Sequence, residues 1–119
     1  MNLLLDTGST TTTILPALSK NLGIDFSKLK KSTFPCTTAK GDIYPHVLPH
    51  VKLTIICNNL KNDYFICPMD YILCLKPSRS GKISNEVINF PICLLGMDIL
   101  RLFTNWRWNY ATHELFLEP

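Results

Sequence analysis

The sequence lacks any apolar run long enough to cross a membrane. Its longest such run, residues 90–97, is far shorter than the roughly 20 residues that a spanning helix needs. The start, Met1-Asn2, carries no positive charge and precedes only a short leucine stretch, so no signal peptide is indicated. These absences favour a cytoplasmic protein with no membrane partner.

A strong excess of one charge is also missing. Lys and Arg number 12 against 9 Asp and Glu, which gives a net charge of +3. The only local basic cluster, Lys28, Lys30 and Lys31, is most simply a solvated loop. No groove of aromatic and basic side chains at strand spacing is present, so we expect no nucleic-acid partner.

The cysteines and histidines show no metal-binding spacing. None of the 5 cysteines forms a Cys-x-x-Cys pair, and none of the 3 histidines stands at ligand distance from one. We therefore expect no metal and no other cofactor. The odd number of cysteines, mostly within apolar runs, predicts buried free thiols in a reducing compartment.

The pattern of apolar residues indicates short strands more than helices. At 119 residues the chain is expected to form a single domain, residues 1–119. Pro16 suits a first helical turn and Gly23 a helix end, which predicts a helix over residues 16–22. A second short helix is predicted over 99–103. Strands are predicted over residues 10–15, 32–38, 43–47, 51–55, 60–67, 90–95, 106–110 and 114–117, so the class is all-β.

One stretch places a carboxylate at the end of a buried strand. The leucines at positions 3–5 run directly into Asp6, Thr7, Gly8 and Ser9 without a spacer. Gly8 lets the backbone bend sharply, and the two hydroxyls can bond the backbone or the carboxylate. Such an Asp6 either caps a turn or is presented for chemistry, and the stretch alone leaves both open.

A second stretch of the same kind occurs far downstream. Leu94-Leu95-Gly96-Met97-Asp98-Ile99-Leu100 again joins an apolar strand to a glycine, and a hairpin with the polar tip Thr37-Thr38-Ala39-Lys40-Gly41 lies between the two. In this order the motifs resemble the retropepsin family, the dimeric aspartic proteases of retroviruses, retrotransposons and related cellular proteins. The resemblance covers residues 3–117. It implies a closed acid-protease β-barrel of one lobe with one or two short helices.

The resemblance implies a role for each matching residue. Asp6 would be the catalytic aspartate, held in a supporting loop of Thr7, Gly8 and Ser9, and the Ser9 hydroxyl would bond the paired carboxylates. The flap would consist of Thr38, Ala39, Lys40, Gly41 and Asp42. The pocket wall would include Ile14, Ile43, Leu95 and Gly96, so apolar side chains are expected on both sides of the cleaved bond. The last strand, residues 115–117, would pair with a second subunit.

Peptide hydrolysis by an aspartic protease requires two carboxylates, whereas the chain has one Asp-Thr-Gly motif. Hydrolysis of an amide by a bound water needs one ionised and one protonated acid, a property for which aspartic proteases are the standard example. We therefore expect an aspartic endopeptidase that acts on peptides or a polyprotein as a homodimer, with water activated between two Asp6 carboxylates. The alternative is a catalytically inactive dimerisation or peptide-binding module of the same fold.

Two features depart from the family pattern, and three further residues are expected to have structural roles. Only 5 residues precede Asp6, so the chain is expected to lack the family's usual N-terminal strand. Residues 68–89 are longer than the matching part of compact viral members and are expected to hold a surface insertion. Asp98 is interpreted as the N-cap of the second helix. Trp106 and Trp108 are expected to pack in the core or at the dimer interface.

Overall fold

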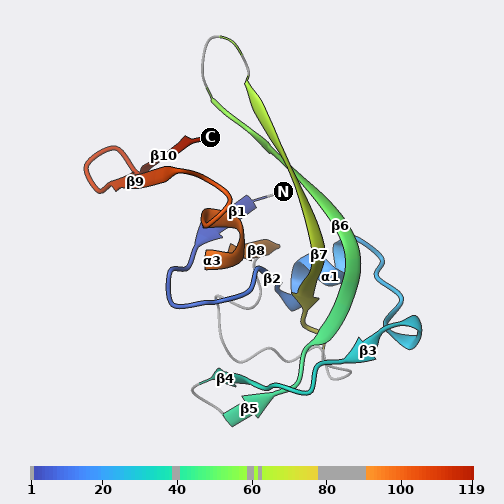
Figure 1. Ribbon diagram of the computed structural model, residues 1–119. Coiled ribbons are helices and arrows are strands. Elements are labelled where there is room, and N and C mark those ends of the chain that lie inside the picture. The colour runs from blue at the N-terminus through green and yellow to red at the C-terminus, as the bar shows by residue number, and fades with distance from the viewer. Residues whose placement is uncertain (1, 39–40, 59–60, 62, 78–90) are drawn as a thin grey trace.

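The computed structural model describes residues 2–38, 41–58, 61, 63–77 and 91–119 (Figure 1). Short strands dominate it, which confirms the expected β class with few short helices. The elements in chain order are β1 (Asn2–Leu5), β2 (Thr13–Ile14), α1 (Pro16–Asn21), the 3-10 turn Phe26–Lys28, β3 (Lys30–Lys31), β4 (Cys36–Thr38), β5 (Gly41–Ile43), β6 (His46–Ile56), β7 (Tyr64–Cys74), β8 (Ile92–Leu95), α3 (Met97–Leu100), β9 (Asn105–Asn109) and β10 (Glu114–Glu118).

The main sheet of the described residues brings the two predicted apolar strands together. Its order is β1-β8-β2-β7-β6-β3, and β1 runs parallel to β8 with Leu5 opposite Leu95. Because the two strands run in the same direction, the residues that follow them, Asp6 and Gly96, emerge at one edge of the sheet. Strand β2 then passes between β8 and β7.

The longest feature is the β6–β7 hairpin, drawn green to yellow in Figure 1. Its strands pair from His46 opposite Cys74 to Ile56 opposite Tyr64. The residues of β7 alternate in exposure as predicted for its first part. Residues 68–74 belong to this strand and Cys74 is fully buried, so the predicted surface insertion is wrong for them. Residues 78–89 of that prediction lie outside the described part of the chain.

Two apolar clusters form the core of the described residues, and Leu53 and Met69 pack against both. One contains Ile14, Leu18, Ile72, Cys74 and Cys93, and the other contains Cys67, Leu95, Ile99, Leu100 and Phe103. In the second cluster the rings of Phe65 and Phe103 meet edge to face with centroids 5.0 Å apart. Both clusters draw on β7 or β8, so the strands beside Asp6 are anchored in the core.

Helix α1 follows its local signals, whereas α3 begins two residues before the predicted range 99–103 and ends at Leu100. Pro16 occupies the first turn of α1, and Gly23 follows the helix with φ of +65°, a conformation that glycine adopts without strain. Helix α3 begins one residue after Gly96, which is its N-cap. The prediction that Asp98 caps this helix is therefore wrong, because its carboxylate bonds another loop.

Two hairpins form separate two-stranded sheets, β4 with β5 and β9 with β10. In Figure 1 they lie towards different ends of the molecule, with β9–β10 in orange to red. Within the described residues, the six-stranded order has β1 and β3 at its two edges, so these ladders do not by themselves show a closed barrel.

All 5 cysteines are free, and those at 67, 74 and 93 are buried. Burial raises the pKa of the Cys74 thiol to about 11. Burial does the same at Cys93, where the Asp98 carboxylate adds to the effect and the pKa is again about 11. These two thiols remain protonated at neutral pH and are therefore poor nucleophiles. In the part of the chain that the structure describes, no helix is long and apolar enough to cross a membrane.

Candidate active site

Asp6 stands directly at the end of β1, where backbone hydrogen bonds hold it against the end of β8. Its amide donates to the Leu95 carbonyl (3.0 Å), and the Ser9 amide donates to the Asp6 carbonyl (3.1 Å). The side chain is half-buried. The strand thus ends at a half-buried carboxylate, but the prediction that the strand itself is buried is wrong for Leu3 and Leu4, which are 41% and 46% exposed.

The two oxygens of the Asp6 carboxylate differ in their surroundings. The Gly8 amide donates to Oδ1 (3.1 Å), which is the turn-capping role that the sequence left open. Among the described residues, none donates a hydrogen bond to Oδ2. A capped carboxylate with one open oxygen is suited to accept a proton from a bound molecule.

Ser9 has a different role from the expected one. Its hydroxyl donates to the Thr11 carbonyl (2.7 Å) and is part-buried, so its proton is used within the loop. The expectation that it bonds the paired carboxylates is therefore not met in this structure. Thr7 and Gly8 are exposed at the tip of the same loop.

Asp98 is held by donors from across the sheet. Its carboxylate accepts the Thr12 amide on both oxygens (3.0 Å each), the Thr12 hydroxyl (2.7 Å) and the Ile99 amide (2.9 Å). Thr12 is fully buried, and its hydroxyl also accepts the Gly96 amide (3.1 Å). Asp98 is thus engaged within the chain and is not placed to serve as a second catalytic acid.

Sequence reasoning missed Thr12, and no local signal could have found it. It is one of four consecutive threonines, and its partner Asp98 is 86 positions away in the chain. A regular helix or strand period would have marked it as buried, but β2 has only two residues.

Gly96 is required by close packing between the same two loops. A Cβ there would lie 2.7 Å from the Thr11 carbonyl carbon and 2.8 Å from the Thr12 nitrogen. Real side chains do not approach backbone atoms so closely, so only glycine fits without a shift of the loop. Gly96 therefore supports the site by letting the loops touch, beneath the aspartate loop as the family resemblance implies.

The predicted flap is a β-hairpin in the structure. Strands β4 and β5 pair with Cys36 opposite Ile43, and the Thr37 hydroxyl donates to Asp42 Oδ1 (3.1 Å). Gly41 has a φ of +114°, which side chains rarely adopt. Ala39 and Lys40, predicted at the tip, lie outside the described residues.

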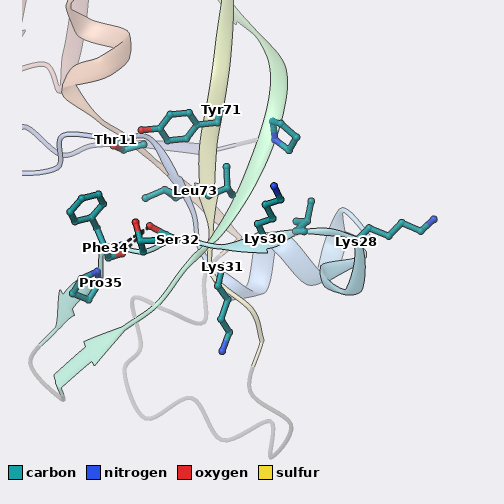
Figure 2. A pocket seen from close by; sticks show the side chains of 13 residues that line it. Thr11, Lys28, Lys30, Lys31, Ser32, Phe34, Pro35, Tyr71 and Leu73 are labelled. Atoms are coloured by element: carbon teal, nitrogen blue, oxygen red, sulfur yellow. Dashed lines mark hydrogen bonds between the residues drawn. The ribbon is translucent and has the colours of Figure 1, made fainter.

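A cavity of about 630 Å³ lies between Thr11 and the base of this hairpin. In Figure 2, Tyr71 and Thr11 stand on one side of it, Phe34 and Pro35 on the other, and Leu73 between them. Phe34 is 79% exposed and Tyr71 48%, so both rings are available to a bound molecule. The lining residues are Thr11, Lys28, Leu29, Lys30, Lys31, Ser32, Thr33, Phe34, Pro35, Val47, Pro49, Tyr71 and Leu73.

This cavity is not built from the residues predicted as pocket walls. Ile14 is 3% exposed and packs in the core, and it does not line this cavity. Ile43 is 41% exposed on β5, and Leu95 is 2% exposed. The pocket-wall role of these residues stays a prediction from the family resemblance.

A second cavity, of about 710 Å³, lies between β1 and the β9–β10 hairpin. We call it the apolar groove; its lining residues are Leu3, Leu4, Leu5, Thr7, Ile55, Leu95, Trp106, Trp108, Tyr110, His113, Leu115 and Leu117. Leu3 and Leu4 are 41% and 46% exposed. An apolar surface of this kind is typical of a protein interface, and it begins one residue from Asp6.

No group of three or more His, Cys, Asp or Glu among the described residues could hold a metal ion. The described residues around Asp6 offer a carboxylate, hydroxyls and backbone amides. These are the groups that acid–base hydrolysis uses.

Comparisons with known proteins bear on the fold. No family model matches the sequence, and no curated protein matches it either. A solved structure does: a retropepsin-like aspartic protease from Rickettsia conorii, 21% identical, with a TM-score of 0.51 over 95% of this chain and 69% of that one. At this identity the likeness shows a shared fold, so the chain has a retropepsin-like fold.

Proposed function

We propose that this chain is an aspartic endopeptidase of the retropepsin type that works as a homodimer. The observation that carries the proposal is the half-buried Asp6 carboxylate, with the Gly8 amide on Oδ1 and no described donor on Oδ2. The supporting loop is Thr7, Gly8 and Ser9. Because Asp98 is engaged by Thr12, the second acid has to come from another copy of the chain.

Two Asp6 carboxylates a few ångströms apart would share one proton. The ionised partner takes a proton from a water between them, and the oxygen of that water attacks the carbonyl carbon of the peptide. The protonated partner donates to the carbonyl oxygen. Collapse of the tetrahedral intermediate breaks the C–N bond, and the amine leaves with a proton from the dyad.

The apolar groove supports the dimer part of this proposal. Leu3 and Leu4 expose apolar surface beside Thr7, and a second copy would remove that surface from water next to the aspartate loop. The same proposal includes two further features. Residues 115–117 would pair with the partner, and the barrel would close around the described edge strands β1 and β3.

The cavity of Figure 2 supports a peptide substrate. It lies between Thr11, five residues after Asp6, and the residues that lead into β4. A peptide held under the flap hairpin (residues 38–42) and over Asp6 would place an apolar side chain between Phe34 and Tyr71. The substrate would thus be a peptide or polyprotein with apolar side chains near the cleaved bond.

The test is cleavage of a peptide library or an unfolded protein by the purified chain. We expect cleavage that a statine-type inhibitor blocks and that Asp6→Asn abolishes, a loss of at least about 10³-fold because the general base is removed. Asp70→Asn, a change at an exposed aspartate of β7, is the matched control and should cleave like the wild type.

Mixing the two forms tests the shared site. If each dimer needs two Asp6 residues, adding Asp6→Asn chains to wild type lowers the activity with the square of the wild-type fraction. A linear decrease, or residual cleavage by Asp6→Asn alone, contradicts the proposal. Peptide binding without any cleavage would instead favour the inactive module of the same fold.

A further inference from the structure

We infer that Thr12 and Asp98 are a positioning pair for Asp6, which fixes the aspartate loop against the loop after β8. The inference rests on the proposed function and assigns roles to two residues that do not contact the reacting atoms. Thr12 and Asp98 form one of the densest groups of side-chain hydrogen bonds in the described residues. The neighbouring strands are already held together by backbone hydrogen bonds, so these side-chain bonds are additional.

The bonds between the two loops form a continuous series that ends at Asp6. The Asp98 amide donates to the Thr10 carbonyl (3.2 Å), and the Met97 amide donates to the Ser9 carbonyl (2.9 Å). The Ser9 amide in turn bonds the Asp6 carbonyl, and the Asp6 amide bonds Leu95. The Thr12–Asp98 link closes this series at its far end, so the aspartate loop is fixed along its length.

The link depends on the acceptor atoms of the Asp98 side chain. Its partners among the described residues are neutral donors, two from Thr12 and one from Ile99. Oδ1 accepts all three donors and Oδ2 only shares the Thr12 amide, so an asparagine with its oxygen at the Oδ1 position keeps these bonds, whereas an alanine removes every acceptor. The Thr12 hydroxyl both donates to Asp98 and accepts from Gly96, so a valine of the same shape would break both bonds.

Loosening this link should affect chemistry more than substrate binding. The position of Asp6 relative to the water and to the partner's carboxylate decides the rate of the chemical step, and small displacements of a reacting group lower that rate strongly. Thr12 and Asp98 do not line the cavity of Figure 2, although Thr11, which does, is the neighbour of Thr12. Substrate affinity should therefore change little.

The experiment compares Thr12→Val, Thr12→Ser and Asp98→Ala with the wild type in kcat, KM and amide hydrogen exchange. We expect kcat to fall by about 10- to 100-fold in Thr12→Val and Asp98→Ala, with KM within about twofold. Thr12→Ser, which keeps the hydroxyl, should retain kcat within about threefold. The double variant should be no worse than the worse single variant, because both changes break one link.

Hydrogen exchange decides the inference independently of catalysis. In Thr12→Val the amides of Asp6, Ser9 and Met97 should exchange at least about tenfold faster, while those of the β6–β7 ladder stay protected. Unchanged exchange at these amides, or wild-type kcat in both Thr12→Val and Asp98→Ala, overturns the inference. A wild type that does not cleave would refute the proposed function, and the exchange result would still decide the inference about Thr12 and Asp98. If Thr12→Val fails to fold, Asp98→Ala, which leaves Thr12 bonded to the Gly96 amide, carries the same comparison.

Discussion

Two aspartates that look alike in the sequence have opposite surroundings. Asp6 and Asp98 each follow an apolar strand and lie two residues from a glycine. Asp98 accepts hydrogen bonds from Thr12 and Ile99, whereas Asp6 accepts one from Gly8. Satisfied acceptors make Asp98 a structural carboxylate, and the open oxygen of Asp6 makes it the candidate for chemistry.

The fold also opposes the ionisation of a buried imidazole. His46 opens β6, is 7% exposed and meets the ring of Phe26 edge to face at 5.1 Å. Burial lowers its pKa below the ordinary value, and the charges of Lys31 and Lys76 lower it further. No described residue forms a hydrogen bond with its Nδ1, so no acceptor stabilises a proton on that nitrogen.

We therefore predict that the wild type loses stability as the pH falls below about 6.5, the ordinary histidine value. Between that value and the lowered pKa of the folded state, the unfolded chain binds more protons at His46, which favours unfolding. Urea unfolding between pH 7.5 and 5 should show a smaller decline in His46→Leu than in the wild type. Lys31→Gln should show an intermediate decline, because it removes one of the two opposing charges. An identical decline in His46→Leu would contradict the prediction.

At the scale of elements, β7 connects the core to the candidate substrate cavity. Its Ile72 and Cys74 are fully buried, and Tyr71 and Leu73 line the cavity of Figure 2. The strand continues through Pro68, which the sequence pattern treats as a break. Pro68 faces Lys52 of β6 on one side. On its other side, in the described sheet, β2 pairs with β7 only further along, at Leu73 and Cys74, so the missing amide of the proline breaks no ladder there.

We predict that Tyr71→Ala raises KM about tenfold for peptides with a large apolar side chain near the cleaved bond. Losing about 1.4 kcal/mol of apolar contact corresponds to that factor, and kcat should change less. The measurement is steady-state cleavage of a peptide series that varies this side chain. Tyr64→Ala, at a tyrosine that is 63% exposed near the far end of the same strand, is the matched control and should leave KM unchanged. Equal KM values for Tyr71→Ala and wild type would exclude this cavity as the substrate site.

At the scale of the whole molecule, the apolar groove lies beside the loop that holds the lone acid. Thr7 belongs to both, and the indoles of Trp106 and Trp108 form part of the groove wall. Self-association across this groove would bury exposed leucine surface and bring a second Asp6 towards the first. The dimer and the catalytic pair would then form in one step.

We predict that Leu4→Glu raises the dimer dissociation constant at least about 100-fold, because it places an unpaired charge in a surface that becomes buried. Sedimentation equilibrium measures the constant, and the cleavage rate should fall in parallel at low protein concentration. Leu22→Glu is the control, since Leu22 is 55% exposed at the end of α1 and outside the groove. A dimer of wild-type affinity in Leu4→Glu would show that the copies associate elsewhere.

Features that depend on neighbouring residues could be predicted along the chain. Pro16 and Gly23 set the limits of α1, the turn around Gly41 sets the β4–β5 hairpin, and the leucines before Asp6 set the strand that carries it. Backbone geometry and alternation act over a few residues, so these signals can be read along the chain.

Which distant residues meet depends on the folding of the whole chain. Folding buried Ile14, joined the two strands predicted over 43–47 and 51–55 into the continuous β6, and paired Thr12 with Asp98 across 86 positions. It also placed the cavity that we propose for the substrate between Phe34 and Tyr71, and Ile14 does not line it. These outcomes depend on which faces of the strands pack together, a choice made by the burial of apolar surface over the whole chain and by no short stretch of it.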